Sequence, residues 1–230
     1  MSKEKPKISI VIPTLNEETG IREVLQSIPY RELVQPEVLV VDGGSVDGTI
    51  EVARGLGATI IPQSKKGYEQ AILEGAKHAR GDIIVFIDGD GVYDPREIPK
   101  MLDFMKSQNA DMVIGSRYLG VREPGAFPSL RDYGNRFFTL LINLLLGIGI
   151  TDVFSGFTAL RKELFEKIEG RIIEPAQYSI IASTYRSNGK IVEVPITFYP
   201  RLGKAKMSTA RSGFRILSQI LKDSMGIGVK

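Results

Sequence analysis

The sequence predicts an α/β fold with a mostly parallel, doubly wound sheet flanked by helices. Short apolar runs alternate with segments of helical periodicity through the first half of the chain. The runs are nearly continuous in apolar residues, as in strands whose two faces are both covered. A chain of 230 residues that is 43% hydrophobic and 25% charged fits one large globular domain.

Five strands and four helices are expected along the first half. The apolar runs that predict strands lie at 8–13, 38–41, 58–62, 82–87 and 111–115. Helical patterns fill the gaps at roughly 17–28, 48–56, 68–79 and 95–107. The last helix has the clearest start, because Asp94 can cap it, Pro95 suits its first position and Glu97 can complete a capping box.

After residue 115 the pattern changes, and the chain is expected to add an elaborated second half to the same domain. The expected segments are a Gly-, Pro- and Arg-rich loop at 115–132, an apolar helix at 136–150, a helix at 174–187, a strand at 191–198 and a basic amphipathic helix at 211–225. The sequence contains no internal repeat, so we expect one domain over 1–230.

Composition excludes several classes of function. The chain has no cysteine, which removes disulfides, thiolate metal sites and a cysteine nucleophile. Its one histidine, His78, is expected on an exposed helix end, and no G-x-S-x-G motif occurs. A net charge of +3 is too mild to indicate nucleic acid. The N-terminus lacks a signal-peptide pattern, and no run of apolar residues is long enough to predict a spanning helix.

Two aspartates one residue apart, Asp88 and Asp90, follow the strand expected at 82–87. Alternate residues of an extended segment face the same side, so both carboxylates can point into the crevice where parallel sheets bind ligands. Two hard oxygen ligands suit Mg²⁺ or Mn²⁺, with positions left for water and a diphosphate. The alternative is a turn with capping aspartates. Two further polar strand ends, PTLNE after the first strand and Asp42 after the second, meet the same edge.

Two segments point to an anionic or membrane partner. The helix at 136–150 has a narrow polar stripe, which fits either a buried core helix or one lying in a membrane interface. At about 22 Å it is shorter than the roughly 30 Å hydrocarbon core. Between Arg201 and Lys222 lie six basic residues and no acidic one, which fits an anionic partner or a solvated face.

Six motifs follow one another along nearly the whole chain, from about residue 8 to 208: PTLNEE, VVDGGSVDGT, ARGDIIVFIDGDGVYDP, GSRY, DVFSGFTALRKELF and EVPITFYPRLGKAK. In this order they resemble family 2 glycosyltransferases with the GT-A fold. The nearest resemblance is to dolichyl-phosphate mannose synthases and related polyprenyl-phosphate hexosyltransferases. The D-x-D pair alone is a weak signal, whereas SGF followed by EVPI and R-x-G-x-x-K is specific.

The resemblance implies inverting, metal-dependent transfer of a hexose from GDP-mannose or a UDP-hexose to dolichyl or polyprenyl phosphate. Residues 1–115 would form the half that binds the nucleotide sugar, and 116–230 the half that faces the acceptor and the membrane. The residues implied to contact the donor are Pro13, Leu15, Glu17, Asp42, Asp88, Gly89, Asp90, Arg201 and Lys206.

The resemblance also implies roles at the reacting groups. Asp88 and Asp90 would bind Mg²⁺ or Mn²⁺, Arg117 and Arg131 would hold the acceptor phosphate, and Asp152 completes the candidate catalytic set. The helix at 136–150 and the C-terminal helix would rest on the cytoplasmic face of a membrane as a peripheral contact. A membrane protein or a second copy of the chain are further candidate partners.

Three positions depart from the family pattern. Val92 stands where many relatives have a metal-binding glutamine, Gly43 and Gly44 replace an acidic pair, and Ala205 replaces a serine. Metal coordination would then be weaker or completed by water, and the hexose and the base stay open.

Two other functions fit the same residues. The first is transfer to a hydroxyl of a glycan or small molecule, which requires a base such as Asp152 or Glu174. A phosphate acceptor requires none, because its second pKa of about 6 leaves it largely dianionic at neutral pH. The second is an inactive nucleotide-binding module that docks at membranes.

Overall fold

A seven-stranded sheet in the order β3-β2-β1-β4-β6-β5-β7 forms the centre of the computed structural model, which describes residues 7–126 and 129–203. The strands are β1 (Ile8–Thr14), β2 (Glu37–Asp42), β3 (Thr59–Pro62), β4 (Ile83–Phe86), β5 (Met112–Ser116), β6 (Thr158–Arg161) and β7 (Ile191–Pro195). Only β6 runs antiparallel to its neighbours, β4 and β5. The sheet is therefore mixed but mostly parallel, as the sequence predicts.

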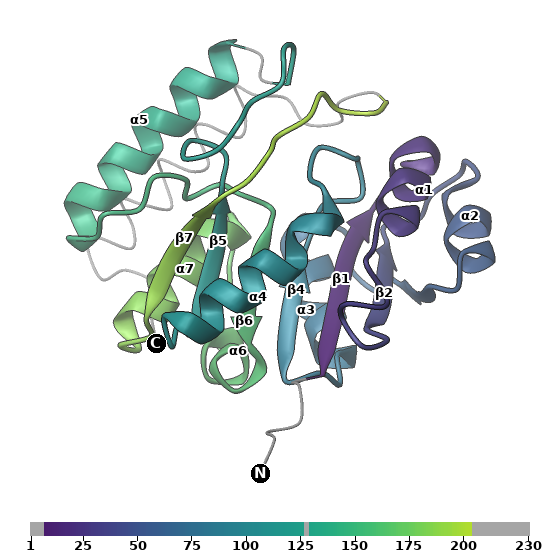
Figure 1. Ribbon diagram of the computed structural model, residues 1–230, viewed down its shortest axis with the longest axis horizontal. Helices are drawn as coiled ribbons and strands as arrows, with labels where there is room; N and C mark the ends of the chain where they lie inside the picture. The colour runs from purple at the N-terminus through teal and green to yellow at the C-terminus, as the bar shows by residue number, and fades with distance from the viewer. Residues whose placement is uncertain (1–6, 127–128, 204–230) are drawn as a thin grey trace.

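Helices cover both faces of this sheet (Figure 1). They are α1 (Glu18–Gln26), α2 (Thr49–Gly55), α3 (Tyr68–His78), α4 (Ile98–Ser107), α5 (Ser129–Leu146), α6 (Lys162–Ile168) and α7 (Ala176–Arg186), with short 3₁₀ turns at Pro95–Glu97 and Glu169–Arg171. One apolar layer packs α1, α2 and α4 against the sheet. The other layer packs α3, α5, α6 and α7 against the opposite face.

The strands and helices of the first half match the predicted ranges to within about two residues, apart from the start of the fourth helix. There Asp94 caps as predicted, since its side chain accepts from the Arg96 amide at 2.9 Å. The capping box is wrong, because Glu97 accepts instead from the Thr197 amide at 2.9 Å. Glu97 thus ties this helix start to the chain that follows β7.

The second half differs more from expectation. The sequence analysis assigned no element to β6 or α6, and the last strand ends at Pro195 rather than at 198. The apolar helix starts earlier, at Ser129, and stops at Leu146, where Gly147 takes a left-handed φ of 67°. The amphipathic helix predicted at 211–225 lies outside the described residues, as do Lys206 and the side chain of Arg131.

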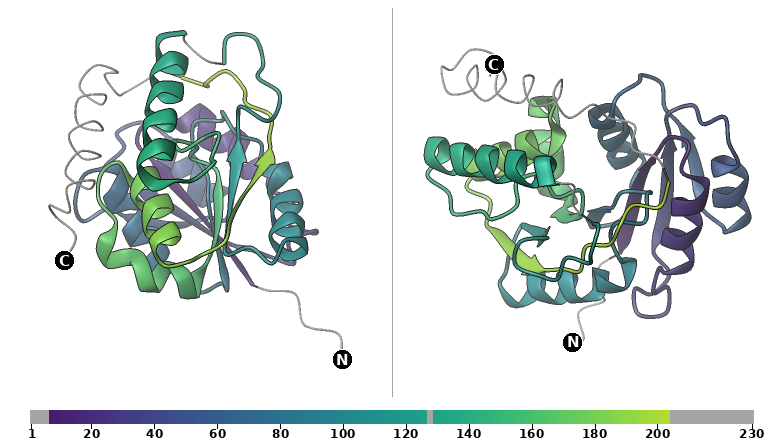
Figure 2. Two further views of the ribbon diagram at one scale, coloured as in Figure 1. Left: turned by 90° about the vertical axis from the view of Figure 1, so that its left-hand side faces the viewer. Right: turned by 90° about the horizontal axis from the view of Figure 1, so that it is seen from above.

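Helix α5, seen in two orientations in Figure 2, has a buried side and an exposed side. Its Ile142 is fully buried, which fits the core interpretation. Its opposite side carries a row of exposed apolar side chains: Tyr133, Phe137, Leu140 and Leu144. Within residues 7–126 and 129–203, no helix has both the length and the apolar character needed to cross a bilayer.

Candidate functional site

The carboxyl ends of β1, β2 and β4 meet at one edge of the sheet. Thr14 at the end of β1 is paired with Asp42 at the end of β2, and β4 runs parallel to β1 on its other side. Asp88 and Asp90 follow β4 directly. The structure thus brings the three predicted polar strand ends together, in the position where open parallel sheets bind ligands.

Asp88 is half-buried at this edge. The Tyr68 hydroxyl donates a hydrogen bond of 2.9 Å to its Oδ1. Burial, together with the charge of Asp90, raises the pKa of Asp88 to about 7, although the Tyr68 hydrogen bond and the charges of Arg117 and Arg201 act in the opposite direction. Two carboxylates this close repel each other when both are ionised, and a bound cation would relieve this repulsion.

Arg201 supplies positive charge to the pair from the far end of the chain. Its guanidinium donates to Asp90 through Nη1 and to Glu17 through Nη2. The segment is held there by backbone hydrogen bonds from Tyr199 N to Val92 O at 2.9 Å and from Leu202 N to Asp90 O at 3.0 Å. Three residues predicted to bind the nucleotide sugar, Glu17, Asp90 and Arg201, therefore meet. They are 73 to 184 positions apart in the chain.

The residues at this edge fit a divalent cation that shares its coordination with a ligand. Within the described ranges, no cluster of three or more His, Cys, Asp or Glu could hold a metal by itself. Asp88 and Asp90 offer hard oxygens, and a diphosphate or water would complete the shell, as is usual for Mg²⁺. The Nε of Arg201 is buried and has no hydrogen-bond partner among the described residues, which leaves one donor for an anion.

Val92, whose side chain has no ligating atom, lies in the core beside this edge. Its side chain is 6% exposed and belongs to the apolar core that packs against α4. A residue buried in this layer stabilises the fold rather than the cation site. Gly89, also a predicted donor residue, is fixed by space, because a Cβ on it would lie 2.6 Å from Thr14 Cγ2.

Asp42 organises the loop that follows β2. Its Oδ2 accepts from the amides of Gly44 and Ser45 at 2.9 Å each, and it is 3% exposed. Gly44 has a φ of 93°, a left-handed value that glycine adopts without strain. The Asn16 side chain accepts from Val46 N at 2.7 Å and joins this loop to the one after β1. Beside it, Leu15 is 41% exposed and Pro13 is half-buried.

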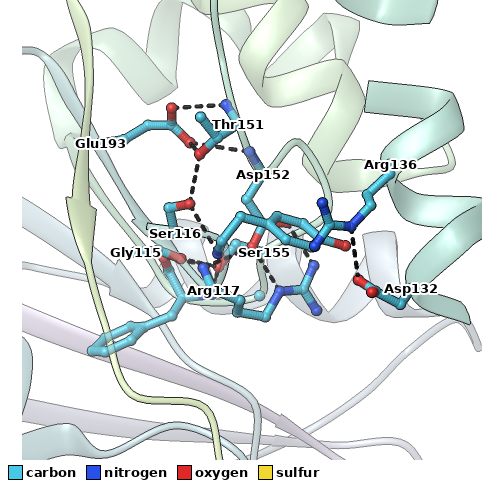
Figure 3. Close-up of polar contacts among 12 residues, drawn as sticks. Gly115, Ser116, Arg117, Asp132, Arg136, Thr151, Asp152, Ser155 and Glu193 are labelled. Carbon is cyan, nitrogen blue, oxygen red and sulfur yellow. Dashed lines mark hydrogen bonds and ion pairs between the residues drawn. The ribbon is translucent and has the colours of Figure 1, made fainter. Parts of the chain in front are cut away.

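A second charged cluster lies at the end of β5 (Figure 3). Arg117 donates to Asp152 from Nε at 2.7 Å and from its amide at 3.0 Å, both to Oδ2, and from Nη2 to Oδ1 at 2.6 Å. The arginine is 6% exposed and the aspartate 0%. A buried pair with this two-point geometry holds the guanidinium in one orientation.

Glu193 on β7 fixes the loop that carries Asp152 (Figure 3). It accepts from the Thr151 amide and hydroxyl at 2.8 Å each and from the Asp152 amide at 3.1 Å. Thr151 also shares a 2.6 Å hydrogen bond with Ser116. The chain of contacts runs from Glu193 through the loop to Arg117.

This geometry corrects the interpretation of Asp152 as a candidate base. The side chain is fully buried, and both oxygens accept from Arg117, so a substrate hydroxyl cannot approach them in this arrangement. Glu174 is half-buried just before α7. His78 is exposed at the end of α3, as expected.

Arginines also surround Tyr118, next to Arg117. Arg136 lies 4.7 Å and Arg122 5.5 Å from the centre of the Tyr118 ring. Both also pair with Asp132, at 3.2 Å from Arg122 and 3.4 Å from Arg136. These contacts connect the start of α5 to the loop after β5. Both segments belong to the half of the chain that is predicted to face the acceptor.

Sequence reasoning missed four residues of these clusters, Tyr68, Tyr93, Gly156 and Glu193. Tyr93 and Gly156 are joined by a 2.9 Å hydrogen bond from the glycine amide to the phenol oxygen. The only signal for three of them is their place inside the quoted motifs, and Tyr68 stands at the predicted start of a helix. Their contacts depend on sheet order, which the sequence does not state.

Comparison with solved structures defines the class of fold. The glucosyl-3-phosphoglycerate synthase of Mycobacterium tuberculosis, solved with Mn²⁺, UDP and glucosyl-3-phosphoglycerate, superposes with a TM-score of 0.75. The match covers 98% of this chain and 82% of that one at 22% identity. The protein therefore has a GT-A-like fold, and the fold prediction is confirmed.

Sequence comparison gives the family. The model of glycosyl transferase family 2 matches residues 9–169, and the chain belongs to that family. It is 32% identical to the dolichyl-phosphate hexose transferase of Haloferax volcanii over 94% of this chain and 92% of the relative. It is 34% identical to the low-salt glycan biosynthesis hexosyltransferase Agl6 of the same organism, over 96% of this chain but 54% of the relative, so it spans about half the length of Agl6.

Proposed function

We propose that the protein transfers a hexose from a nucleotide-diphosphate sugar to a polyprenyl phosphate, with inversion at the anomeric carbon. A relative that matches over most of both chains is named a dolichyl-phosphate hexose transferase. The observation that carries the proposal is the Arg117–Asp152 pair. It presents a fixed guanidinium near the acidic edge and leaves the nearby aspartate unavailable as a base.

A phosphate acceptor fits these residues better than a hydroxyl. Its oxygen is already charged at neutral pH, since the second phosphate pKa is about 6. The bond from the anomeric carbon to the donor diphosphate breaks, and a bond to the acceptor phosphate oxygen forms, without any proton transfer. The protein then has to position and neutralise the phosphate, for which Arg117 and Arg131 are the proposed residues.

At the donor side, Asp88 and Asp90 would hold Mg²⁺ or Mn²⁺. Such a cation, when bound, offsets the charge that develops on the departing diphosphate. Glu17, Asp42, Leu15 and Pro13 are proposed to line the nucleotide site. Arg201 is proposed to turn from the carboxylates of Asp90 and Glu17 to the phosphates of the nucleotide sugar. Gly89 and Lys206 are proposed as further contacts to the nucleotide sugar.

The exposed row on α5 supports a peripheral contact with the membrane that holds the lipid acceptor. Four of its side chains, those of Tyr133, Phe137, Leu140 and Leu144, are more than half exposed, at 72%, 59%, 59% and 74%. Apolar side chains at this spacing form one face of a helix and can enter the interface of a bilayer. We place this contact on the cytoplasmic face, where nucleotide sugars are available.

The test compares two acceptors that differ only in the phosphate. The protein is incubated with Mn²⁺ and a labelled UDP- or GDP-hexose, with either a short polyprenyl phosphate or the matching polyprenol. We expect labelled lipid from the phosphate alone. Transfer to the polyprenol but not to the polyprenyl phosphate would contradict the proposal.

A further inference from the structure

The Asp88 carboxylate is enclosed on two sides by residues that have no assigned role. On one side is Tyr68, the first residue of α3, whose hydroxyl donates to Asp88 Oδ1 at 2.9 Å. An ionised carboxylate oxygen can only accept, so the phenol is the donor in this contact.

On the other side is Gly156, in the SGF motif. A Cβ at this position would lie 2.2 Å from Asp88 Oδ2, so only glycine leaves room for the carboxylate. The glycine cannot move away easily. Its amide donates to the Tyr93 hydroxyl at 2.9 Å, and the preceding Ser155 donates to Gly115 O at 2.7 Å.

The two sides together fix the direction in which Asp88 points. One oxygen is held by a hydrogen bond, and the other fits against a backbone that a side chain would displace. Asp90 repels the ionised Asp88, so without these contacts Asp88 would turn away from its neighbour. Groups that orient a ligating carboxylate commonly determine how well a site binds its metal.

We infer that Tyr68 and Gly156 are positioning residues that hold Asp88 in the orientation required to bind the divalent cation. The inference rests on the proposed function, because that function places the cation at Asp88 and Asp90. It also explains the SGF motif physically. Ser155 anchors the turn, Gly156 makes room for the carboxylate, and Phe157 packs with its ring 5.6 Å from that of Tyr93.

Tyr68→Phe is a clean substitution for testing this role. The Tyr68 ring lines a small pocket between α3 and α7 with Ile72, Phe86 and Ile180. Phenylalanine keeps the ring in that pocket and removes only the oxygen that contacts Asp88. Tyr30→Phe is a matched control, since Tyr30 is a partly exposed tyrosine in the loop after α1.

The measurement is Mn²⁺ affinity by electron paramagnetic resonance, alone and with saturating UDP or GDP. We expect Tyr68→Phe to weaken Mn²⁺ binding by roughly 10-fold or more, and Tyr30→Phe to leave it unchanged. Gly156→Ala should weaken it at least as much, with thermal unfolding used to confirm that the variant is folded. In an Asp88→Asn background, Tyr68→Phe should have no further effect, because its partner is already altered.

The possible failures are distinguishable. If the wild-type protein binds Mn²⁺ and Tyr68→Phe binds it equally well, the Tyr68 assignment is overturned while the proposed function stands. If Tyr68→Phe weakens Mn²⁺ binding as much in the Asp88→Asn background as in the wild type, the effect does not act through Asp88. The effect is then a general structural one, and the assignment also fails. If the wild-type protein binds no Mn²⁺ under any condition, the metal-dependent part of the proposed function is contradicted. The inference about Tyr68 and Gly156 is then contradicted as well.

Discussion

The Arg201 guanidinium donates to the carboxylate of Asp90, one of the two residues proposed to bind a cation. It also reaches Glu17, so it joins three separate parts of the chain. A cation arriving at Asp90 must compete with this arginine. A nucleotide diphosphate would relieve the competition, because it offers Arg201 another anionic partner.

Arg201→Gln should therefore have opposite effects on two ligands. We expect Mn²⁺ alone to bind about 5-fold more tightly, because the competing charge at Asp90 is gone. We expect UDP or GDP to bind more weakly in the presence of Mn²⁺, because a phosphate donor is lost. Calorimetric titrations of both ligands check this, and Lys100→Gln, on an exposed part of α4, is a control for simple loss of charge. Weaker binding of Mn²⁺ alone would contradict the competition.

The raised pKa of Asp88 gives a prediction for stability. In the folded protein the pKa is about 7, against an ordinary 3.8. Between these values the folded state binds more protons than the unfolded state, so the free energy of unfolding falls as pH rises from about 4 to 7. Asp88→Asn removes this dependence. Without metal, the variant should be more stable than the wild type at pH 8 by about 1 kcal/mol or more.

Thermal unfolding at pH 4.5 and pH 8 in the presence of a chelator measures this difference. The gain should be visible at pH 8 and nearly absent at pH 4.5. Addition of Mn²⁺ should reverse the order at pH 8, because only the wild type retains both carboxylates. A variant that is less stable than the wild type at both pH values would show that Asp88 has a structural role instead.

Sequence reasoning found the first half of the fold because its signals are local. The runs at β1, β2 and β4 are apolar and continuous, and their polar ends are adjacent in any parallel sheet. The strand β6 has only four residues and pairs antiparallel with both neighbours. No local pattern distinguishes such an inserted strand from a loop, so its position had to come from the three-dimensional packing.

The site was found as a set of residues but not as a set of contacts. Arg117 and Asp152 were given separate roles, as a phosphate ligand and as a candidate base. They are 35 positions apart and pair only because the loop before β6 returns to the end of β5. The burial of Val92 in the core was likewise not visible in the sequence. In both cases the missing information is the spatial neighbour of a side chain, which one sequence does not specify.

The pairing of Arg117 changes what Asp152→Asn can show. Both acceptor hypotheses now expect this variant to lose activity, either through loss of a base or through release of Arg117. Only the pairing expects a large loss of stability, about 3 kcal/mol or more, because the buried guanidinium loses its countercharge. Urea unfolding measures it. The affinity of the Asp152→Asn variant for the nucleotide diphosphate should remain near that of the wild type. A variant with normal stability would favour an unpaired Asp152.

The exposed row on α5 gives the last prediction. Leu140 and Leu144 are 59% and 74% exposed and lie one turn apart, so they face the same side of the helix. Burying each leucine in a membrane interface is worth up to about 1.5–3 kcal/mol. Leu140→Glu with Leu144→Glu should therefore reduce binding to vesicles that contain anionic lipid by at least 10-fold. The matched control is Val34→Glu, which places the same charge at another exposed apolar site, 61% exposed, after α1.

Sedimentation with vesicles measures membrane binding. Transfer to a short-chain, water-soluble polyprenyl phosphate tests whether the active site is still intact. We expect the double variant to lose vesicle binding but to keep transfer to the short acceptor, because neither leucine is among the residues proposed to bind the donor or the acceptor phosphate. Equal binding of the double variant and the control would remove α5 from the membrane contact. Loss of both properties would instead show that α5 stabilises the acceptor half, since Arg136 and Asp132 connect its first turns to Tyr118.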